Sequence, residues 1–445
     1  MTVPLADRPD DSRRVSALLG LLFGVAGMGS SSAAIVLPRM AQDYGITVAQ
    51  GAWTISLYVL MLGVTTALYG RISDLVGIRR PLAFGVAMMV GGAVVAALAP
   101  SYGVHLAGRI LQGAGAAAVP TLGVAAITAR YEGSVRSLGL GRLAGMTAVL
   151  SGLGPLLGGA VEAVAGWRAV MVLPVLAVLV LPFVWHALRT EGTGHRLDLV
   201  GAVLVALTAG GMVLLVQSPS TGLVVALVGA VLLVVGAPAV ALWVRRRPLG
   251  FLPVDVLRNG TVLRSSLAAA AIPAGWFALL ISVPAILLAR SWEPWQVGLL
   301  LIPGAVTGLF TPRFAGRLLD RIGAAASLVI ASVGASVSLL LAMAGALWTS
   351  PVLLALSVMV ISTCFAIGQP ALMGAVGDAV HVDIRGVALG IATLLFLTGG
   401  SVGSAIVGGL GDVIGFPLSI LLLAVLPLLG AAGLVPSVRA ARQPG

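Results

Sequence analysis

Two long segments without a charged residue set the strongest constraint on how this chain folds. Leu199 to Val244 holds 46 consecutive uncharged residues, and Ile322 to Gly377 holds 56. A helix that crosses about 30 Å of hydrocarbon needs roughly 20 residues, so each segment is long enough for two such helices. Each also contains one polar, proline-bearing break, QSPST at 217–221 and WTSP at 348–351. We therefore predict two tight helical hairpins in a lipid bilayer.

The composition of the whole chain indicates the same solvent. Of 445 residues, 59% are hydrophobic and only 9% are charged, too few polar groups for a water-soluble surface. All 26 basic residues are arginines, and they are spread along the chain, which argues against a nucleic-acid partner. The single cysteine, Cys364, excludes an internal disulfide. The four histidines lack metal-ligand spacing, and there is no P-loop, so we expect no metal, no cofactor and no enzymatic activity.

Dividing the chain at its charged turns predicts fourteen membrane spans. The first uncharged run, Val15 to Pro38, is longer than the apolar region of a secretory signal and is therefore interpreted as an uncleaved first span. The predicted spans cover residues 15–37, 51–70, 82–99, 103–128, 137–162, 168–187, 198–217, 222–243, 262–289, 296–315, 325–347, 352–377, 385–410 and 416–435.

The positions of the arginines predict the orientation. With the N-terminus inside, only Arg39, Arg168 and Arg290 lie at outer ends and Arg109 lies within a span, which leaves 22 arginines in the cytoplasm. Short loops with positive charge are retained there. We expect a multi-pass protein of the cytoplasmic (inner) membrane with both termini in the cytoplasm. A model with twelve spans requires both long uncharged segments to be misassigned.

Two sequence repeats indicate an internal duplication. GRISDLVG at 70–77 recurs as GRLLDRIG at 316–323, 246 residues later, and RSLGLG at 136–141 recurs as RGVALG at 385–390, 249 residues later. Parallel repeats are typical of transporters in which two bundles rock about a central site. We predict an all-α integral membrane protein with six-helix bundles at 15–190 and 262–437, two inserted helices at 191–244, a cytoplasmic linker at 245–261, and cytoplasmic tails at 1–14 and 438–445.

Several motifs in this order resemble the major facilitator superfamily, specifically its fourteen-helix drug/proton antiporter branch. They are GRISDLVGIRR at 70–80, GRILQGAGAA at 108–117 and GPLLGG at 154–159, supported by QGAWTISLYVL at 50–60 and GWR at 166–168. The resemblance covers nearly the whole chain. It implies the major facilitator fold and export of small molecules in exchange for protons.

The repeated charged turn is interpreted as a conformational latch. Asp74 follows the second span, where its carboxylate could cap the span that starts near Ile384 and Arg385 when the bundles close on the cytoplasmic side. Arg71 and Arg80 would hold the loop, and Asp320 would do the mirror job against the fifth span. The alternative is that these arginines are ordinary positive-inside anchors. The latch residues are Gly70, Arg71, Asp74, Gly77, Arg80, Gly316, Arg317, Asp320 and Arg385.

GPLLGG in the fifth span predicts a seam between helices. Gly154, Gly158 and Gly159, with Gly152 before them, remove side chains so that another helix can approach, and Pro155 permits a bend. The resemblance implies that this hinge lies between the bundles and is associated with export. Because 59 glycines are spread through the chain, general small-residue packing is the alternative.

Arg109 is the most costly residue of the predicted spans. A guanidinium inside a span costs roughly 2.5 kcal/mol or more, so it should face the bundle interior or a water-filled cavity. Glu162, at a similar depth in the fifth span, is the candidate partner, and the pair with Gln112 could serve proton coupling. In the alternative, Arg109 is a hydrogen-bond hub with Gln112 and helix carbonyls, and Glu162 is a surface acid.

One departure from the resemblance concerns the first span. Members of the branch usually carry an acid ahead of an ALP sequence, whereas alignment on VLP at 36–38 places Gly29 there. The proton carrier is therefore open, and uniport or another coupling site is an alternative. Few embedded charges favour an uncharged or amphipathic substrate. The candidate cavity residues, which could equally face lipid or packing seams, are Met28, Trp53, Tyr58, Met61, Trp276, Phe277 and Phe396.

The sequence thus predicts a proton-driven exporter of hydrophobic small molecules. We expect it to contact substrate, protons and membrane lipids as a monomer, with the arginines and Phe251 of the 245–260 linker along anionic headgroups. The alternative from another class is a lipid-handling or scaffold protein of the envelope that does not transport drugs.

Overall fold

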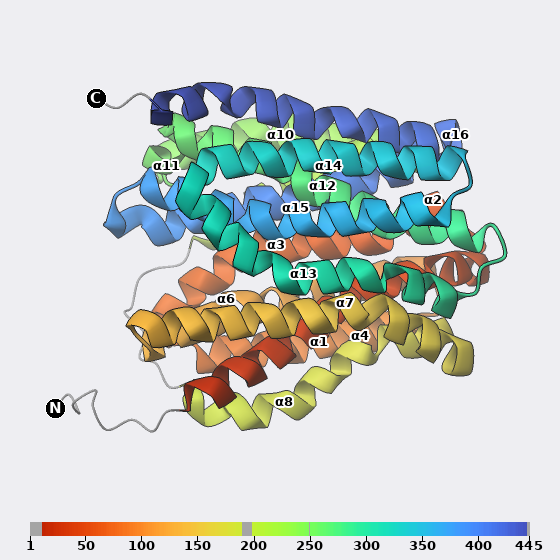
Figure 1. Cartoon of the computed structure of the whole chain (residues 1–445), viewed down its shortest axis with the longest axis horizontal. Coiled ribbons are helices and arrows are strands. Elements are labelled where there is room, and N and C mark those ends of the chain that lie inside the picture. The colour runs from red at the N-terminus through yellow and green to blue at the C-terminus, as the bar shows by residue number, and fades with distance from the viewer. Residues whose placement is uncertain (1–10, 189–197, 249, 443–445) are drawn as a thin grey trace.

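The computed structural model describes residues 11–188, 198–248 and 250–442, and every element in these ranges is helical. The helices run side by side along one long axis (Figure 1). Helix α1 (Ser12–Tyr44) begins and helix α16 (Val382–Arg442) ends at the same end of the molecule. We call this end the terminal side and the other end the opposite side.

The first half of the chain runs from α1 to the 3-10 turn η3. Ala52 joins α2 to α3 and Ala117 joins α5 to α6, and both have right-handed helical backbone angles, so each pair continues as one rod. The bounds are α2 Val48–Gly51, α3 Trp53–Val76, α4 Arg79–Leu98, α5 Tyr102–Ala116, α6 Ala118–Arg130, α7 Gly133–Met171, η2 Leu173–Leu176, α8 Ala177–Val184 and η3 Trp185–Ala187.

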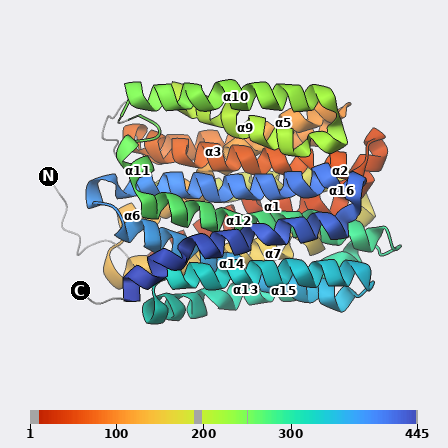
Figure 2. The ribbon, with the colours of Figure 1, turned by 90° about the horizontal axis from the view of Figure 1, so that it is seen from above.

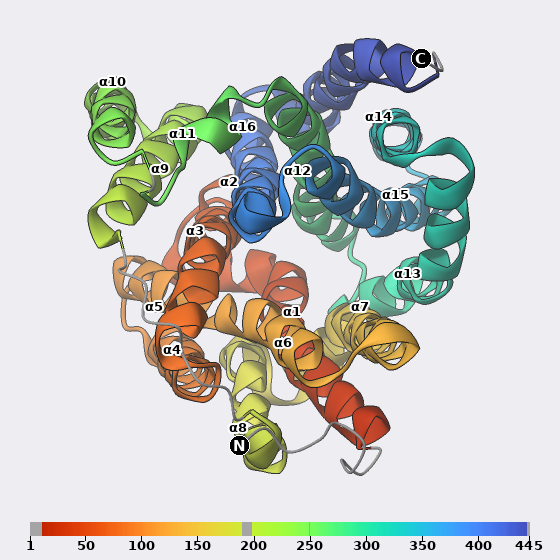
Figure 3. The same cartoon turned by 90° about the vertical axis from the view of Figure 1, so that its left-hand side faces the viewer.

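The rest of the described chain contains an inserted hairpin, a short linker helix and the second half. Figure 3, which views the molecule from the terminal side, shows the two halves facing each other with the hairpin beside α3 and α16. The bounds are α9 Leu199–Thr221, α10 Leu223–Arg246, α11 Val254–Arg258, α12 Gly260–Leu288, α13 Pro294–Ile322, α14 Ala324–Leu347 and α15 Pro351–Asp378.

Most of these helices are long and apolar enough to cross a membrane. Eleven described helical segments meet both conditions, and two further apolar helices, Leu173–Ala187 and Pro294–Thr307, are shorter. The last of the eleven, Val387–Pro436, is 50 residues long and is broken at Gly415, whose backbone angles are not helical. This is a multi-pass membrane protein.

The first predicted hairpin turn lies slightly later than the sequence indicated. QSPST was expected to break the helix, but α9 continues to Thr221 and the chain reverses at Gly222, where φ is 99°. Pro219 cannot donate to the carbonyl of Leu215, and the Ser218 hydroxyl donates to that carbonyl instead, at 2.8 Å. This substitute bond lets the helix pass the proline.

Glycines with positive φ mark equivalent places in the two halves. Gly77 and Gly323, which end the repeated charged turn, have φ of 76° and 82°. Gly166 and Gly415, which break α7 and α16, have φ of 77° and 81° and lie 249 residues apart. Only glycine adopts such angles at no steric cost. The two sharp reversals of each half therefore depend on glycines at matching positions.

The most buried helices lie at the centre and the inserted hairpin lies at the edge. Of the most apolar window of each helix, 78% is buried in α1 and 89% in α12, against 11% in α10. Figure 2 shows α10 at the margin, with α9 between it and α3. The faces of α10 that do not pack against protein are apolar, as a lipid-facing surface requires.

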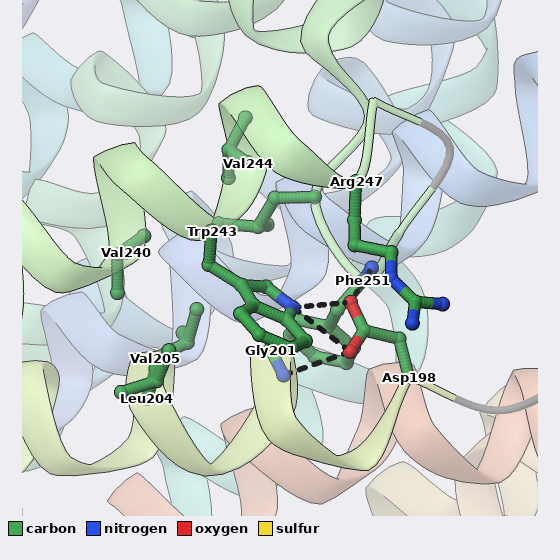
Figure 4. A pocket seen from close by; sticks show the side chains of 10 residues that line it. Asp198, Gly201, Leu204, Val205, Val240, Trp243, Val244, Arg247 and Phe251 are labelled. Carbon is green, nitrogen blue, oxygen red and sulfur yellow. Dashed lines mark hydrogen bonds between the residues drawn. The ribbon is translucent and has the colours of Figure 1, made fainter.

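Asp198 ties the inserted hairpin to the linker that follows it (Figure 4). Its carboxylate accepts from the amides of Gly201 and Phe251 at 2.9 and 2.8 Å and from the indole of Trp243 at 3.0 Å. Burial opposes ionisation of Asp198, but these hydrogen bonds outweigh it and hold the pKa of the carboxyl below its usual value. The prediction that Phe251 lies on headgroups is wrong, because this ring is buried among α9 and α3 residues.

Candidate functional site

Arg109 forms the centre of a polar hub where three helices of the first half converge. The residue is fully buried. Its Nε donates to the Thr54 carbonyl of α3 at 2.9 Å, and its Nη1 donates to the Gly29 carbonyl of α1 at 2.9 Å and to Gln112 Oε1 at 2.5 Å. The Tyr58 ring lies 4.4 Å from the guanidinium carbon. Carbonyl dipoles and an aromatic face thus replace the water around this cation.

The expected pairing of Arg109 with Glu162 is not found. Glu162 instead lies 3.7 Å from the Nε of Arg39, at the end of the first span. The reason is helix adjacency, because α7, which carries Glu162, packs mainly on α1, while Arg109 is enclosed between α1 and α3. Similar depth in the sequence did not reveal which helices are neighbours.

Gly29 is tightly packed against the hub in this conformation. A Cβ placed on Gly29 would lie 3.1 Å from Gln112 Nε2, 3.2 Å from Pro174 Cγ and 3.6 Å from the Tyr58 hydroxyl oxygen. Any side chain at this position would therefore point at the Gln112 amide. The structure places Gly29, where the branch usually has an acid, within hydrogen-bond distance of the buried guanidinium.

One face of the GPLLGG segment lies against α1. A Cβ on Gly154 would overlap the Ser31 hydroxyl, and one on Gly158 would lie 2.9 Å from Ser32 Cβ. Ser31 also donates to the Ser151 carbonyl at 3.0 Å. The backbone angles stay helical at Pro155, and the chain leaves the helical conformation only later in α7, at Gly166.

The other face of the same segment meets the second half of the chain. A Cβ on Gly152 would overlap Ala305 of α13, and one on Gly159 would lie 2.6 Å from the Pro294 carbonyl oxygen. α7 is therefore packed between α1 and α13 through glycines on two faces. The backbones of the two halves touch along this line, which we call the α7–α13 seam.

A second seam joins α3 to α16 through small polar residues. The hydroxyls of Ser56 and Ser404 lie 2.8 Å apart, and Ser401 donates to the Ser56 carbonyl at 2.7 Å. A Cβ on Gly63 would lie 3.0 Å from Leu397 Cβ. These serines were not identified from the sequence, although the dense run of glycine and serine in TGGSVGSAIVGG at 398–409 was a usable signal.

Comparison with known proteins identifies the family and the fold of this chain. The model of the Major Facilitator Superfamily matches residues 19–253 and 265–444. This chain belongs to the Major Facilitator Superfamily. A solved POT family transporter in complex with 5-aminolevulinic acid has a TM-score of 0.70 at 12% identity and covers 97% of both chains, which shows the fold alone.

Curated relatives of this superfamily member are named as transporters or as a multidrug resistance protein. The uncharacterized transporter YebQ of Escherichia coli is 26% identical over 70% of each chain. The multidrug resistance protein Stp of Mycobacterium tuberculosis is 26% identical over 66% of this chain and 56% of its own length. The uncharacterized MFS-type transporter EfpA of the same species is 30% identical over 42% of this chain and 36% of its own.

Gln217 of the inserted hairpin contacts both halves of this major facilitator protein. With its amide oxygen directed at Trp53, it accepts from the Trp53 amide at 3.2 Å and from the indole at 3.0 Å. A Cβ on Gly408 of α16 would lie 3.1 Å from the Gln217 amide group. Trp53, expected in a substrate cavity, therefore packs in the junction of α3, α9 and α16. The expectation that Trp53 lines a central cavity did not take into account that the inserted hairpin packs against this part of α3.

The other candidate cavity residues lie in two groups. Tyr58 is engaged with Arg109, whereas Trp276 and Phe396 join an aromatic cluster through Phe365, at ring-centroid distances of 6.0 and 5.3 Å. Phe365 of α15 was not identified from the sequence. Met28, Phe277 and Phe396 are buried, and Met61 and Trp276 are half-buried.

The candidate latch lies at the terminal side and is only partly described. The side chains of Arg71 and Asp74 lie outside the described residues. Arg80, Arg317, Asp320 and Arg385 are exposed, and the described side chains form no ion pair with them. Among the described atoms, an added Cβ on Gly316 would meet nothing within 4 Å, and one on Gly70 would meet only Thr121 of its own half.

Proposed function

We propose that this chain is a fourteen-span exporter that exchanges hydrophobic or amphipathic small molecules for protons. Membership of the superfamily and similarity to Stp, a multidrug resistance protein, support export of drugs. The span number is supported by eleven long apolar segments, two shorter ones and the break at Gly415 within the longest segment. The arginine distribution supports termini in the cytoplasm and a place in the cytoplasmic membrane.

The position of the contacts between the two halves is the observation that carries this proposal. The seams include Ser56, near the start of α3, and Pro294, at the start of α13, and both helices start at the end away from the terminal side (Figure 1), which on this orientation faces outward. Closing one mouth while the other opens is how paired repeats achieve alternating access. We assign the closed seams to a conformation that faces the cytoplasm, with the repeated charged turns as the latch of the other conformation.

Arg109 and Gln112 are the coupling centre in this proposal. Thr54 and Tyr58 belong to the same stretch of α3 as Ser56, which forms the α3–α16 seam. Parting the seam therefore shifts two of the groups that surround the guanidinium. Opening of the seam therefore alters the hub, and a rearrangement of the hub alters the stability of the closed seam. This reciprocity is what coupling between two sites requires.

Everted vesicles test the proposal. Addition of a transported lipophilic compound to vesicles with a preset pH gradient should dissipate the gradient, and Arg109→Gln should abolish that response because it removes the charge and two carbonyl bonds. Lys retains charge but lacks the planar fork, so Arg109→Lys should remain strongly impaired. A panel of lipophilic compounds without any gradient response would favour a scaffold or lipid-handling protein instead.

A further inference from the structure

The charge of Arg109 has no counter-charge in the described part of the chain. Its partners are two backbone carbonyls, a side-chain amide oxygen and an aromatic ring, all of them neutral. The described ion pairs involve Arg39, Arg130 and Arg168. Buried charges in proteins are normally paired, because an isolated charge in a low-dielectric interior is costly. An anion is therefore the missing partner of this hub.

Two hydrogen-bond donors of the hub are also without an acceptor. Arg109 Nη2 and Gln112 Nε2 are both buried and have no hydrogen-bond partner among the described residues, and the two residues are 0% and 1% exposed. Both side chains lie beside Gly29, since Arg109 bonds its carbonyl at 2.9 Å and Gln112 Nε2 would be 3.1 Å from a Cβ there. Unpartnered buried donors cost about 1–3 kcal/mol each, so two of them on neighbouring residues of one hub indicate that an acceptor binds there.

The donor set fits a carboxylate. A guanidinium and an amide offer two N–H groups from separate side chains, one of them charged, which suits the two oxygens of a planar monoanion. Gly29 contributes no side chain to fill the position, so the carboxylate must come from outside the chain.

We propose that the position beside Gly29 binds the carboxylate of an amphipathic organic anion, held by Arg109 and Gln112. This inference rests on the proposed export function and names a class of substrate for it: molecules with an apolar body and one acidic group. The Tyr58 ring, which is buried beside the guanidinium, would meet the apolar part.

The site is closed in this conformation by Tyr58. The Tyr58 hydroxyl donates to the Ala26 carbonyl at 3.2 Å and its ring covers the guanidinium, while Ser56 one half-turn earlier bonds Ser404. Ala26, Tyr58 and Arg109 all belong to the first half, so the anion gains access when Tyr58 turns away from Arg109 within that half.

Thermal unfolding of the purified full-length protein tests this site without relying on transport. Benzoate and its uncharged analogue benzamide serve as matched probes, with chloride as a third arm and sulfate buffer of equal ionic strength as the baseline. We expect benzoate to raise the unfolding midpoint saturably by a few degrees, benzamide and chloride to have no such effect, and Arg109→Gln to lose the response.

Gly29→Asp and Gly29→Asn separate charge from volume at the site. Asp supplies the missing carboxylate, so Gly29→Asp should fold, show a higher midpoint than Gly29→Asn in the absence of ligand and no longer respond to benzoate. Equal effects of benzoate and benzamide, an unchanged response in Arg109→Gln, or an equal response to chloride would overturn the carboxylate site. Dissipation of the pH gradient by uncharged compounds in the same wild-type protein would leave the export function standing.

Discussion

The two ends of the molecule use the same residue type, glycine, to different effect. At the opposite side, Gly152 and Gly159 of α7 bring its backbone against α13, and a Cβ on Gly298 of α13 would lie 2.7 Å from Leu156 Cα. At the terminal side, a Cβ on Gly141 of α7 or on Gly316 of α13 would meet none of the described atoms within 4 Å. The same two helices are therefore in backbone contact at one end and apart at the other.

The α3–α16 pair repeats this gradient. Ser56 and Ser404 are hydrogen-bonded at the opposite side, whereas a Cβ on Gly390 toward the terminal side would only approach Ala67 Cβ, at 4.0 Å. Glycines without close neighbours have no packing role in this conformation. Small residues therefore line both ends of the interface between the halves, and in this conformation their contacts are closer at the opposite side than at the terminal side.

A covalent lock on the closed seam should have the largest effect. In a Cys364→Ser background, a disulfide between Ser56→Cys and Ser404→Cys would hold α3 to α16, because their hydroxyls are already 2.8 Å apart. We expect oxidation to abolish gradient dissipation in vesicles and a reductant to restore it. Ser404→Cys alone, oxidised in the same way, should remain active. Full activity of the locked protein would show that this seam does not open.

Overpacking the α7–α13 seam should have the next largest effect. Leu at Gly152 would overlap Ala305 and force the halves apart, at a cost of about 1–3 kcal/mol to the closed form. The matched control is Gly141→Leu on the same helix, where the added side chain has open space. Thermal unfolding and transport should both fall for Gly152→Leu. Equal losses of stability and transport in the two variants would show that the two ends of the interface are packed alike.

Loss of the Gln217 amide should have a moderate effect. Gln217→Leu leaves the buried Trp53 indole without its acceptor, so we expect a loss of about 1 kcal/mol in stability and weakened docking of the hairpin. Gln369→Leu on α15 is the control, since Gln369 is exposed and makes no hydrogen bond within the described chain. If Gln217→Leu were as stable as Gln369→Leu, apolar packing alone would hold α9 against the two halves.

The Asp198 anchor should have the smallest effect and a pH dependence of known sign. Its pKa is below the ordinary 3.8 in the folded protein, so the ionised form favours the docked linker. The contribution is complete above about pH 4 and is lost as the pH falls through the lowered folded value. Hydrogen exchange of the Phe251 amide should be faster in Asp198→Asn at neutral pH. Exchange rates that match in both proteins would show that the carboxylate does not hold the linker.

Much of the fold could be predicted because lipid leaves the backbone few options. Uncharged length indicated the helices, and the repeated turns ending at Gly77 and Gly323 indicated the duplication, since their positive φ allows little besides glycine. The burial of Arg109 followed from its cost. These features are local to one segment and appear directly in the sequence.

The partners of those residues could not be predicted in the same way. Depth along a helix matched Glu162 to Arg109, but α1 takes the place between them and Arg39 is the contact of Glu162. Trp53 was assigned to a central cavity because the packing of α9 against α3 is not visible in either segment alone. Which helix lies beside which is set by tertiary packing, and a single sequence holds only weak signals for it.

The most direct test of the account is a pair of distances measured in the same protein. Spin labels at Gly141 and Gly316 report the terminal side, and labels at the exposed Val164 and Trp295 report the opposite side, in a Cys364→Ser background. Double electron–electron resonance in nanodiscs at acidic and alkaline pH should show one distance distribution shortening as the other lengthens. Two distances that move in the same direction, or that both stay fixed, would contradict alternating closure of the two ends.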